Sequence, residues 1–377
     1  MLSDNALSQS DLRLRSVGCR HVKTHRKPSA NPPQRWGAGV VKMFHALPAY
    51  FGGKRRLLGP IFRLLPGPAD APVFVDPFLG GGAVSLYAKA RGYRVVCNDV
   101  ALRSHITGQA LIENDHVTLS HDDLVALSVP MQEVGYAEAH LVPDAFPRSH
   151  AALLDCFVGH AAQCRGPRRA LASLLAVKMA LRLRPMGNFG AKTIMHQVAA
   201  GAWEEMNPHY VRDLVTRGVP RHPIRMAEII RRQINAGVFS NGQVNEAQRG
   251  DALDFLSRTQ GDICYMDPPY SGTQSYERSM KPLDDLLNGG PADLPPSPFS
   301  TDPPDRILPL LFEAADHIPV WVLSYGNARI TLPELMDLMR RYRPQVEGRA
   351  INYVHCTGLA GDESRARNQE LLVIGRR

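Results

Sequence analysis

A strand, a glycine turn, a helix and a second strand follow one another near residue 80, and this order most constrains the fold. The run Val73 to Asp76 is apolar and ends in an acid, and the run Arg94 to Asp99 has the same character. Between them, residues 83 to 90 carry an apolar helical period. Because such a unit joins parallel strands, the sequence predicts an α/β fold with a parallel sheet.

Three later parts of the chain have the same strand-like character. Residues 262 to 267 and residues 319 to 324 are short apolar runs, each typical of a buried strand. Residues 350 to 355 and residues 370 to 374 are separated by a polar stretch, which predicts an antiparallel hairpin near the C-terminus.

The stretch from 113 to 249 interrupts this pattern and differs from it in charge. Helical periods cover 151 to 157 and 168 to 183. Residues 113 to 149 hold seven acids and one Arg, whereas residues 151 to 249 hold fourteen Lys or Arg and six acids. A basic segment suits a polyanion, although a solvated surface without a partner has the same composition. We predict that the whole stretch is an inserted domain.

The remaining segments set the domain boundaries. Residues 1 to 42 are polar and basic without a sustained hydrophobic period, which predicts a disordered tail and makes Met43 a candidate translation start. Residues 281 to 305 are dense in Pro, Gly and Asp, which predicts a long mobile loop. The main domain is then expected over 43 to 112 and 250 to 377.

Composition argues against several classes of protein. There is no run of about 18 or more apolar residues, so no membrane span is expected. The N-terminus lacks the apolar core of a secretion signal, which predicts a cytoplasmic protein. The six cysteines never form a C-x-x-C pair, so we expect neither a disulfide scaffold nor a metal site. A monomer is the default expectation.

The glycine turn Asp76-Pro-Phe-Leu-Gly-Gly-Gly82 stands at the carboxyl end of the first strand, where an open α/β sheet binds its ligand. Its spacing is not G-x-G-x-x-G, and it lacks the Lys-Ser/Thr of a phosphate loop. It therefore favours a ligand with an amino acid moiety, while a plain strand-to-helix turn stays open. Asp99 ends the next strand, where it could accept hydrogen bonds from a ribose or cap the following helix.

The sharpest motif is Asp267-Pro-Pro-Tyr270, directly after an apolar strand. The two prolines fix the backbone and remove two N–H donors, which leaves carbonyl groups free to accept hydrogen bonds. An aspartate, a rigid carbonyl and an aromatic ring suit an amino group on a planar base, because that group needs two acceptors and a stacking surface. A Pro-Pro turn without chemistry is the alternative interpretation.

Taken in order, these motifs resemble the Dam-type, D12-class family of adenine-N6 DNA methyltransferases. Tyr50-Phe-Gly-Gly-Lys54 comes first, the glycine turn second, the inserted segment third and Asp-Pro-Pro-Tyr last, as in that family. The resemblance runs from about residue 47 to the C-terminus. It implies an α/β, Rossmann-like S-adenosylmethionine-dependent methyltransferase sheet with a C-terminal antiparallel hairpin, plus an inserted, mostly helical target-recognition domain that binds DNA.

The resemblance also implies an activity and a set of residues. The activity is transfer of a methyl group from S-adenosylmethionine to N6 of a flipped-out adenine in double-stranded DNA, as in restriction-modification. The implied catalytic residues are Asp267, Pro268, Pro269 and Tyr270. The implied cofactor contacts are Tyr50, Lys54, Asp76, Pro77, Phe78, Gly80, Gly82, Asp99, Asp251, Ala252 and Asp267. Residues 184 to 192 loosely resemble a DNA-contacting stretch, and the candidate DNA contacts are Arg182, Arg184, Asn188, Phe189, Lys192 and Arg221.

Other activities stay open at this point. An amino-group methyltransferase acting on cytosine N4, on RNA or on protein would use related chemistry, and a non-catalytic nucleic-acid-binding protein could keep the basic segment. The Gly-Gly-Lys motif favours DNA, and Asp267 favours adenine because Ser commonly stands there in cytosine-N4 enzymes. The recognition sequence depends on side-chain geometry, so the sequence predicts neither the target site nor a partner nuclease.

Overall fold

The structure is a computed structural model that describes residues 42–50, 52–184, 189, 192–272, 276–352 and 368–377. All of these residues belong to one compact unit that runs from Trp36 to Arg377. The tail predicted to be disordered lies outside the described residues, except for Lys42.

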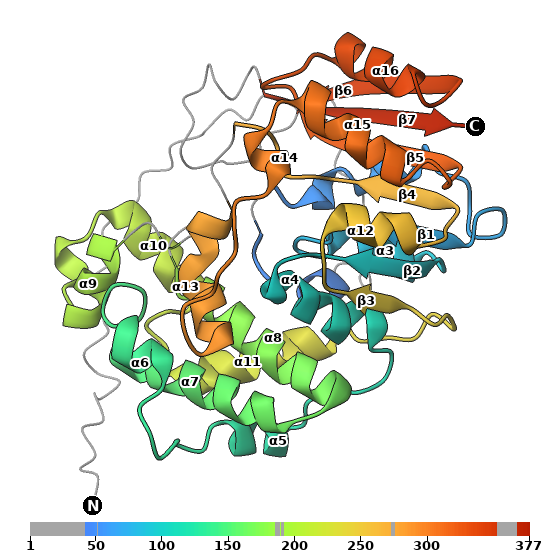
Figure 1. Cartoon of the computed structure of the whole chain (residues 1–377). Coiled ribbons are helices and arrows are strands. Elements are labelled where there is room, and N and C mark those ends of the chain that lie inside the picture. Colours follow the sequence, from blue (N-terminus) through green and yellow to red (C-terminus); the bar gives the residue numbers. More distant parts are fainter. Residues whose placement is uncertain (1–41, 51, 185–188, 190–191, 273–275, 353–367) are drawn as a thin grey trace, which may run out of the picture. The chain divides into compact units, whose positions relative to one another are not determined.

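A sheet of seven strands forms the centre of the described part of the chain (Figure 1). The strands lie in the order β3-β2-β1-β4-β5-β7-β6. Their bounds are β1 (Val73–Asp76), β2 (Arg94–Asn98), β3 (Glu246–Gln248), β4 (Ile263–Met266), β5 (Val320–Gly326), β6 (Gln345–Asn352) and β7 (Gln369–Arg376). Strands β1 to β5 pair in parallel, and β7 is antiparallel to both β5 and β6. The predicted parallel sheet and C-terminal hairpin are therefore confirmed.

The helices fall into two groups. Those that precede or follow strands of the sheet are η1 (Lys54–Arg56), α2 (Leu58–Phe62), α3 (Ala83–Ala90), α4 (Leu102–Thr107), η2 (Gly108–Glu113), α12 (Ala252–Arg258), α13 (Tyr276–Asn288), α14 (Pro298–Thr301), α15 (Pro304–Ala314) and α16 (Leu332–Arg340). Those of the helical segment that follows η2 and precedes β3 are α5 (His121–Leu127), α6 (Tyr136–His140), α7 (Arg148–Gln163), α8 (Gly166–Arg182), α9 (Lys192–Ala200), η4 (Trp203–Glu205), α10 (Pro208–Arg217) and α11 (Pro223–Asn235). The helical periods of the sequence correspond to α3, α7 and α8.

Different helices cover the two faces of the sheet, because alternate side chains of a strand point to opposite faces. Phe74 and Val95 lie in one apolar cluster with α3, and Val75 and Val96 lie in a second cluster with α12, α15 and α16. A strand that is buried on both faces needs a nearly continuous apolar run. This requirement is why β1, β2, β4 and β5 could be found in the sequence.

The helical segment between β2 and β3 shares its core with the first of these faces. Helix α8 packs against α7 and α11 and also against α4 and η2 beside the sheet. Leu174 of α8 and Ile230 of α11 lie in the same apolar cluster as Phe74. The separation of 113–249 from the rest of the chain as a recognition domain stays a prediction, since the apolar core is continuous across that boundary.

Strand β3 lies inside the range predicted for the inserted domain, yet it forms the edge of the sheet. It pairs in parallel with β2, and Ala247 is opposite Cys97. Its three residues are all half-buried, and two of them are polar. The sequence did not predict this strand because it has no apolar run of the length expected for a buried strand.

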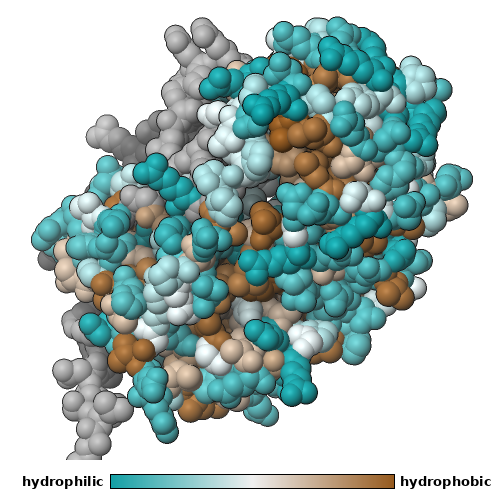
Figure 2. Space-filling view, viewed as in Figure 1, coloured by the Kyte–Doolittle hydropathy of each residue, from teal (hydrophilic) through white to brown (hydrophobic). Residues whose placement is uncertain are grey.

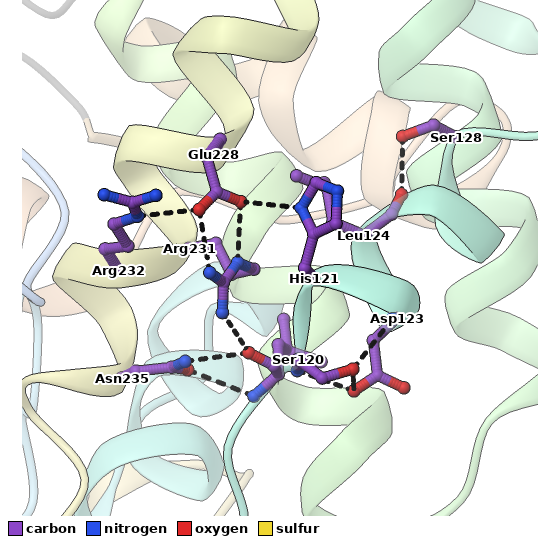
Figure 3. Close-up of polar contacts among 10 residues, drawn as sticks. Ser120, His121, Asp123, Leu124, Ser128, Glu228, Arg231, Arg232 and Asn235 are labelled. Carbon is purple, nitrogen blue, oxygen red and sulfur yellow. Dashed lines mark hydrogen bonds and ion pairs between the residues drawn. The ribbon is translucent and has the colours of Figure 1, made fainter.

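Helix α5 is attached to α11 by polar contacts (Figure 3). Ser120 and Asp123 form a capping box at the start of α5. Arg231 of α11 donates a hydrogen bond to the Leu119 carbonyl at 2.5 Å, and its guanidinium also binds Glu228 at 2.8 Å. Hydrogen bonds from Arg231 are the main reason why the pKa of Glu228 is lowered to about 2. These contacts fix the direction in which the chain enters the helical segment.

The prediction of a long mobile loop over 281 to 305 is wrong for the first and last parts of that range, which are helical. Helix α13 continues to Asn288 with Pro282 inside it, and α14 begins at Pro298. Met280, Leu283 and Leu286 are buried at a spacing of three residues, so α13 packs an apolar side against α4, α6, α7 and α8. This tertiary packing outweighs the helix-breaking composition from which a loop was predicted.

The surface of the described residues is mainly hydrophilic in the view of Figure 2, where apolar residues gather in small patches between the elements. Within the part of the chain that the structure describes, no helix is long and apolar enough to cross a membrane.

Candidate active site

A cavity of about 760 Å³ opens where the carboxyl ends of β1, β2 and β4 meet. Parallel strands place their following loops at one edge of the sheet, so motifs that are far apart in the sequence come together there. The cavity brings together nearly all the predicted cofactor and catalytic residues: Tyr50, Lys54, Asp76, Pro77, Phe78, Gly80, Asp99, Asp251, Ala252, Asp267, Pro268, Pro269 and Tyr270. Gly82 does not line the cavity, whereas Gly81, which belongs to the predicted Asp76–Gly82 turn but was not named individually, does.

The glycine turn after β1 is held by two aspartates. Asp76 is buried, and its carboxylate accepts hydrogen bonds from the Phe78 N–H at 3.2 Å and the Ser85 hydroxyl at 2.6 Å. Burial raises the pKa of Asp76 to about 7. Asp99 accepts hydrogen bonds from the N–H groups of Gly80 at 2.8 Å and Ala101 at 2.9 Å, so it joins the turn to the start of α4. Both carboxylates therefore shape the turn, and both residues line the cavity.

The glycines of the turn let Tyr50 lie directly against the backbone. Gly80 has a φ of +53° and Gly82 a φ of +77°, in the left-handed region that favours glycine. A Cβ atom at Gly81 would lie 2.7 Å from the Cβ of Tyr50, and one at Gly80 would lie 3.1 Å from its ring. A side chain at Gly80 or Gly81 would crowd the Tyr50 side chain in its present position.

A buried lysine contacts the Asp-Pro-Pro-Tyr motif. Lys54 begins η1, is 4% exposed, and places its Nζ 2.8 Å from Oδ1 of Asp267 and 3.1 Å from the Gly52 carbonyl oxygen. The same Nζ lies 5.1 Å from the ring centre of Tyr270. The two motifs that the sequence separates by more than two hundred residues therefore form one ion pair at the end of β4.

Glu370 of β7 is a member of this cluster that the sequence analysis missed. It is fully buried and accepts a hydrogen bond from the Tyr270 hydroxyl at 2.6 Å and another from the Ser324 hydroxyl. Its Oε1 also lies 3.5 Å from Lys54 Nζ. The available signal was an acid at the start of the apolar run Leu371 to Ile374, since a buried strand rarely carries an unpaired charge.

Tyr270 is held in one orientation by these contacts. Its ring centre is 5.0 Å from that of Tyr325, and a Cβ atom at Gly326 would lie 2.7 Å from the Tyr270 ring. Burial, with the negative charges of Asp267 and Glu370, holds the pKa of Tyr270 well above its usual range. The hydroxyl is therefore a neutral hydrogen-bond donor.

The predicted DNA contacts separate into two places. Arg184 is fully buried and donates to the carbonyl of Ala145 at 2.8 Å, and Lys192 is exposed and pairs with Asp144 at 2.6 Å. The ring of Phe189 is buried 5.8 Å from that of Phe146. Burial of Arg184 and Phe189 gives these side chains a role in packing around residues 144 to 146. Their contact with DNA stays a prediction.

The other two predicted contacts lie near the end of α8. Arg182 is half-buried and donates to the Arg217 carbonyl at 2.5 Å. Arg221 is exposed, and its charge is close enough to lower the pKa of Arg182, which burial lowers most. Asn188 lies outside the described residues. The described side chains include no group of three or more His, Cys, Asp or Glu that could hold a metal ion.

The parallel sheet with its C-terminal antiparallel hairpin, and the cavity that joins the glycine turn to Asp-Pro-Pro-Tyr, are consistent with an α/β methyltransferase. Residues 50–151 match the model of the family described as D12 class N6 adenine-specific DNA methyltransferase. The chain is 26% identical over 340 residues to the Type II methyltransferase M2.HphI of Haemophilus parahaemolyticus. This alignment covers 86% of this chain and 96% of that relative. The match over residues 50–151 and the similarity to this relative support a site-specific adenine DNA methyltransferase that uses a methyl donor.

Proposed function

We propose that this methyltransferase transfers the methyl group of S-adenosylmethionine to N6 of an adenine that has been flipped out of double-stranded DNA. The observation that carries the proposal is the single cavity in which the Asp76–Gly82 turn faces Asp267 and Tyr270. A base inside the duplex cannot reach such a cavity, so the adenine must leave the helix at a cost of about a few kcal/mol.

The residues of the cavity fit S-adenosylmethionine. The backbone of Gly80 and Gly81 allows close approach of an extended ligand, and the rings of Phe78 and Phe299, 4.9 Å apart, offer apolar surface for a purine. Asp99 and Asp251 line the cavity with carboxylates that suit ribose hydroxyls. When bound, this cofactor would supply a methyl group on a positively charged sulfur, and the sulfur would leave as a neutral thioether when an amine takes that methyl group.

The Asp-Pro-Pro-Tyr motif makes the adenine amine nucleophilic. Its lone pair is delocalised into the ring, and hydrogen bonds from N6 to the Asp267 carboxylate and the Pro268 carbonyl draw that pair back onto nitrogen. Lys54 holds Asp267 in place at 2.8 Å, and the fixed ring of Tyr270 provides a stacking surface. N6 must lose one proton as it gains the methyl group, and Asp267 accepts it.

The proposal is tested by incubating the protein with labelled S-adenosylmethionine and unmethylated double-stranded DNA, followed by nucleoside analysis. The expected product is N6-methyladenine, and sequencing of the modified DNA then gives the target site. The same assay on single-stranded DNA and on RNA serves as the substrate control. Label on cytosine, or transfer only to RNA, would contradict the proposal.

Gly81→Ala is expected to weaken S-adenosylmethionine binding by about 5- to 150-fold. The new Cβ atom would meet the Cβ of Tyr50 at 2.7 Å, so the turn or Tyr50 must move, at a cost of about 1–3 kcal/mol. Calorimetric titration of the cofactor measures the effect. Gly67→Ala is the matched control, because nothing lies within 4 Å of a Cβ atom there. Equal affinities of the two variants would show that the contact with Tyr50 is unimportant.

A further inference from the structure

A second cavity, of about 620 Å³, lies next to the active-site cavity. The two share Tyr50, Gly53, Gly81 and Ala83 as lining residues, so the Tyr50 side of the glycine turn faces both. The walls come from residues 44 to 56, from α8 and α11, and from the end of α10. None of the sequence motifs predicted this cavity.

The charged residues that line this second cavity are all basic. Among the described residues of its lining there is neither Asp nor Glu, and the basic residues are Arg55, Arg56, Lys178, Arg182 and Arg217. We refer to it as the basic cavity. Arg217 forms an ion pair with Asp213, its neighbour one turn earlier in α10, at 2.9 Å. The other four come from η1 and α8, which are separated by more than a hundred residues in the sequence.

These cations are close enough to repel one another. Burial lowers the pKa of Lys178 to about 7, with further contributions from the charges of Arg55 and Arg182. Burial also lowers the pKa of Arg182, and the charges of Arg221 and Arg217 act in the same direction. Lys178 donates hydrogen bonds to the carbonyls of His45 and Leu47, which offset part of its charge. Crowding the remaining like charges in a partly buried cavity is unfavourable, and an anion would offset them.

Position and chemistry identify the anion. The planar guanidinium of arginine matches the oxygens of a phosphate, and three arginines from η1 and α8 line one cavity. A ligand in the basic cavity lies beside the site in which the target base must be placed. The polyanion that reaches both cavities at once is the DNA strand that carries this base.

We propose that the basic cavity binds a backbone phosphate of the DNA strand next to the nucleotide that enters the active-site cavity. The proposal rests on the proposed function, because it takes the flipped nucleotide as the occupant of the first cavity. Such a contact carries no base information and fixes the position of the strand. It assigns Arg55 and Arg56, which directly follow Lys54, to substrate binding.

The test measures DNA binding without catalysis. The affinity of the full chain for unmethylated duplex DNA is determined by fluorescence anisotropy at several salt concentrations, with Arg55→Gln, Arg56→Gln and the double variant. The plot of log K against log salt has a negative slope, and each lost phosphate contact is expected to make that slope shallower by about 1. Binding should weaken about equally for all DNA sequences. The affinity for S-adenosylmethionine should stay within about twofold of the parent value.

Two controls separate a phosphate contact from other causes. Arg340→Gln makes the same charge change on α16, outside both cavities, and should leave the salt slope unchanged. The double variant Arg55→Lys, Arg56→Lys keeps the charge and should restore most of the slope. If Arg55→Gln and Arg56→Gln behave like Arg340→Gln, the proposal is wrong.

Inorganic phosphate distinguishes DNA from a small free anion. At constant ionic strength, phosphate should compete weakly with DNA, and the Gln variants should lose this competition together with DNA affinity. Tight phosphate binding with unchanged DNA affinity of the variants would instead identify a small-anion site and overturn the proposal. Failure of the proposed function has a separate signature, since DNA would then be bound with the normal slope but never methylated.

Discussion

Asp267→Ala is expected to abolish methyl transfer while the protein keeps its fold. Asp267 follows the last residue of β4, is about one-fifth exposed, and does not belong to either apolar cluster. Its carboxylate is the acceptor that we assign to the N6 amine of adenine. Loss of such a preorganised group lowers kcat by a factor on the order of 10³.

The measurement for Asp267 separates chemistry from binding. Single-turnover transfer from labelled S-adenosylmethionine gives the rate of the chemical step, and anisotropy gives the DNA affinity of the same sample. Asp337→Ala, on the exposed surface of α16, is the control for removal of an acid. If Asp267→Ala kept more than about a tenth of the parent rate, the assignment would be refuted, because loss of the acceptor is expected to lower the rate far more than about tenfold.

Glu370→Gln is expected to lower kcat by about 10- to 100-fold, with cofactor affinity within about twofold of the parent. The amide keeps the size of the side chain and can still accept a hydrogen bond from Tyr270. It removes the negative charge that lies 3.5 Å from Lys54, so the lysine is left with Asp267 as its counter-charge in this cluster. A tighter pair between Lys54 and Asp267 competes with the adenine amine for the same carboxylate.

Glu370 is thus assigned as a positioning residue, and its test needs a readout that stability alone does not move. The ratio of the effect on kcat to the effect on cofactor affinity is that readout, with thermal unfolding measured in parallel. Glu347→Gln, on the exposed edge strand β6, is the matched control. If Glu370→Gln lowered kcat and cofactor affinity by the same factor, and also lowered the melting temperature, the role of Glu370 would be structural.

Much of the sheet could be predicted because buried parallel strands must be apolar on both faces. Residues 73 to 76, 94 to 98, 263 to 266 and 320 to 326 each met that condition, and each is a strand. The three-residue edge strand β3 lacks an apolar run, and helix α13 contains Pro282, so local composition predicted neither of them. Both depend on neighbours that are distant in the sequence: β2 for the strand, and α4, α6, α7 and α8 for the helix.

The sequence by itself determined the class of enzyme, because Tyr50 to Lys54, the Asp76 to Gly82 turn and Asp267 to Tyr270 are local patterns in a definite order. Tertiary structure decided which other residues join them. Glu370 joins Lys54, Asp267 and Tyr270 only because β7 inserts between β5 and β6. Arg55 comes near Lys178 and Arg182 only because the fold brings η1 and α8 to the walls of one cavity. A motif made of neighbouring residues can be recognised in the sequence. Contacts across the sheet and between helices join residues that are distant in the sequence, so they depend on the packing of the whole core.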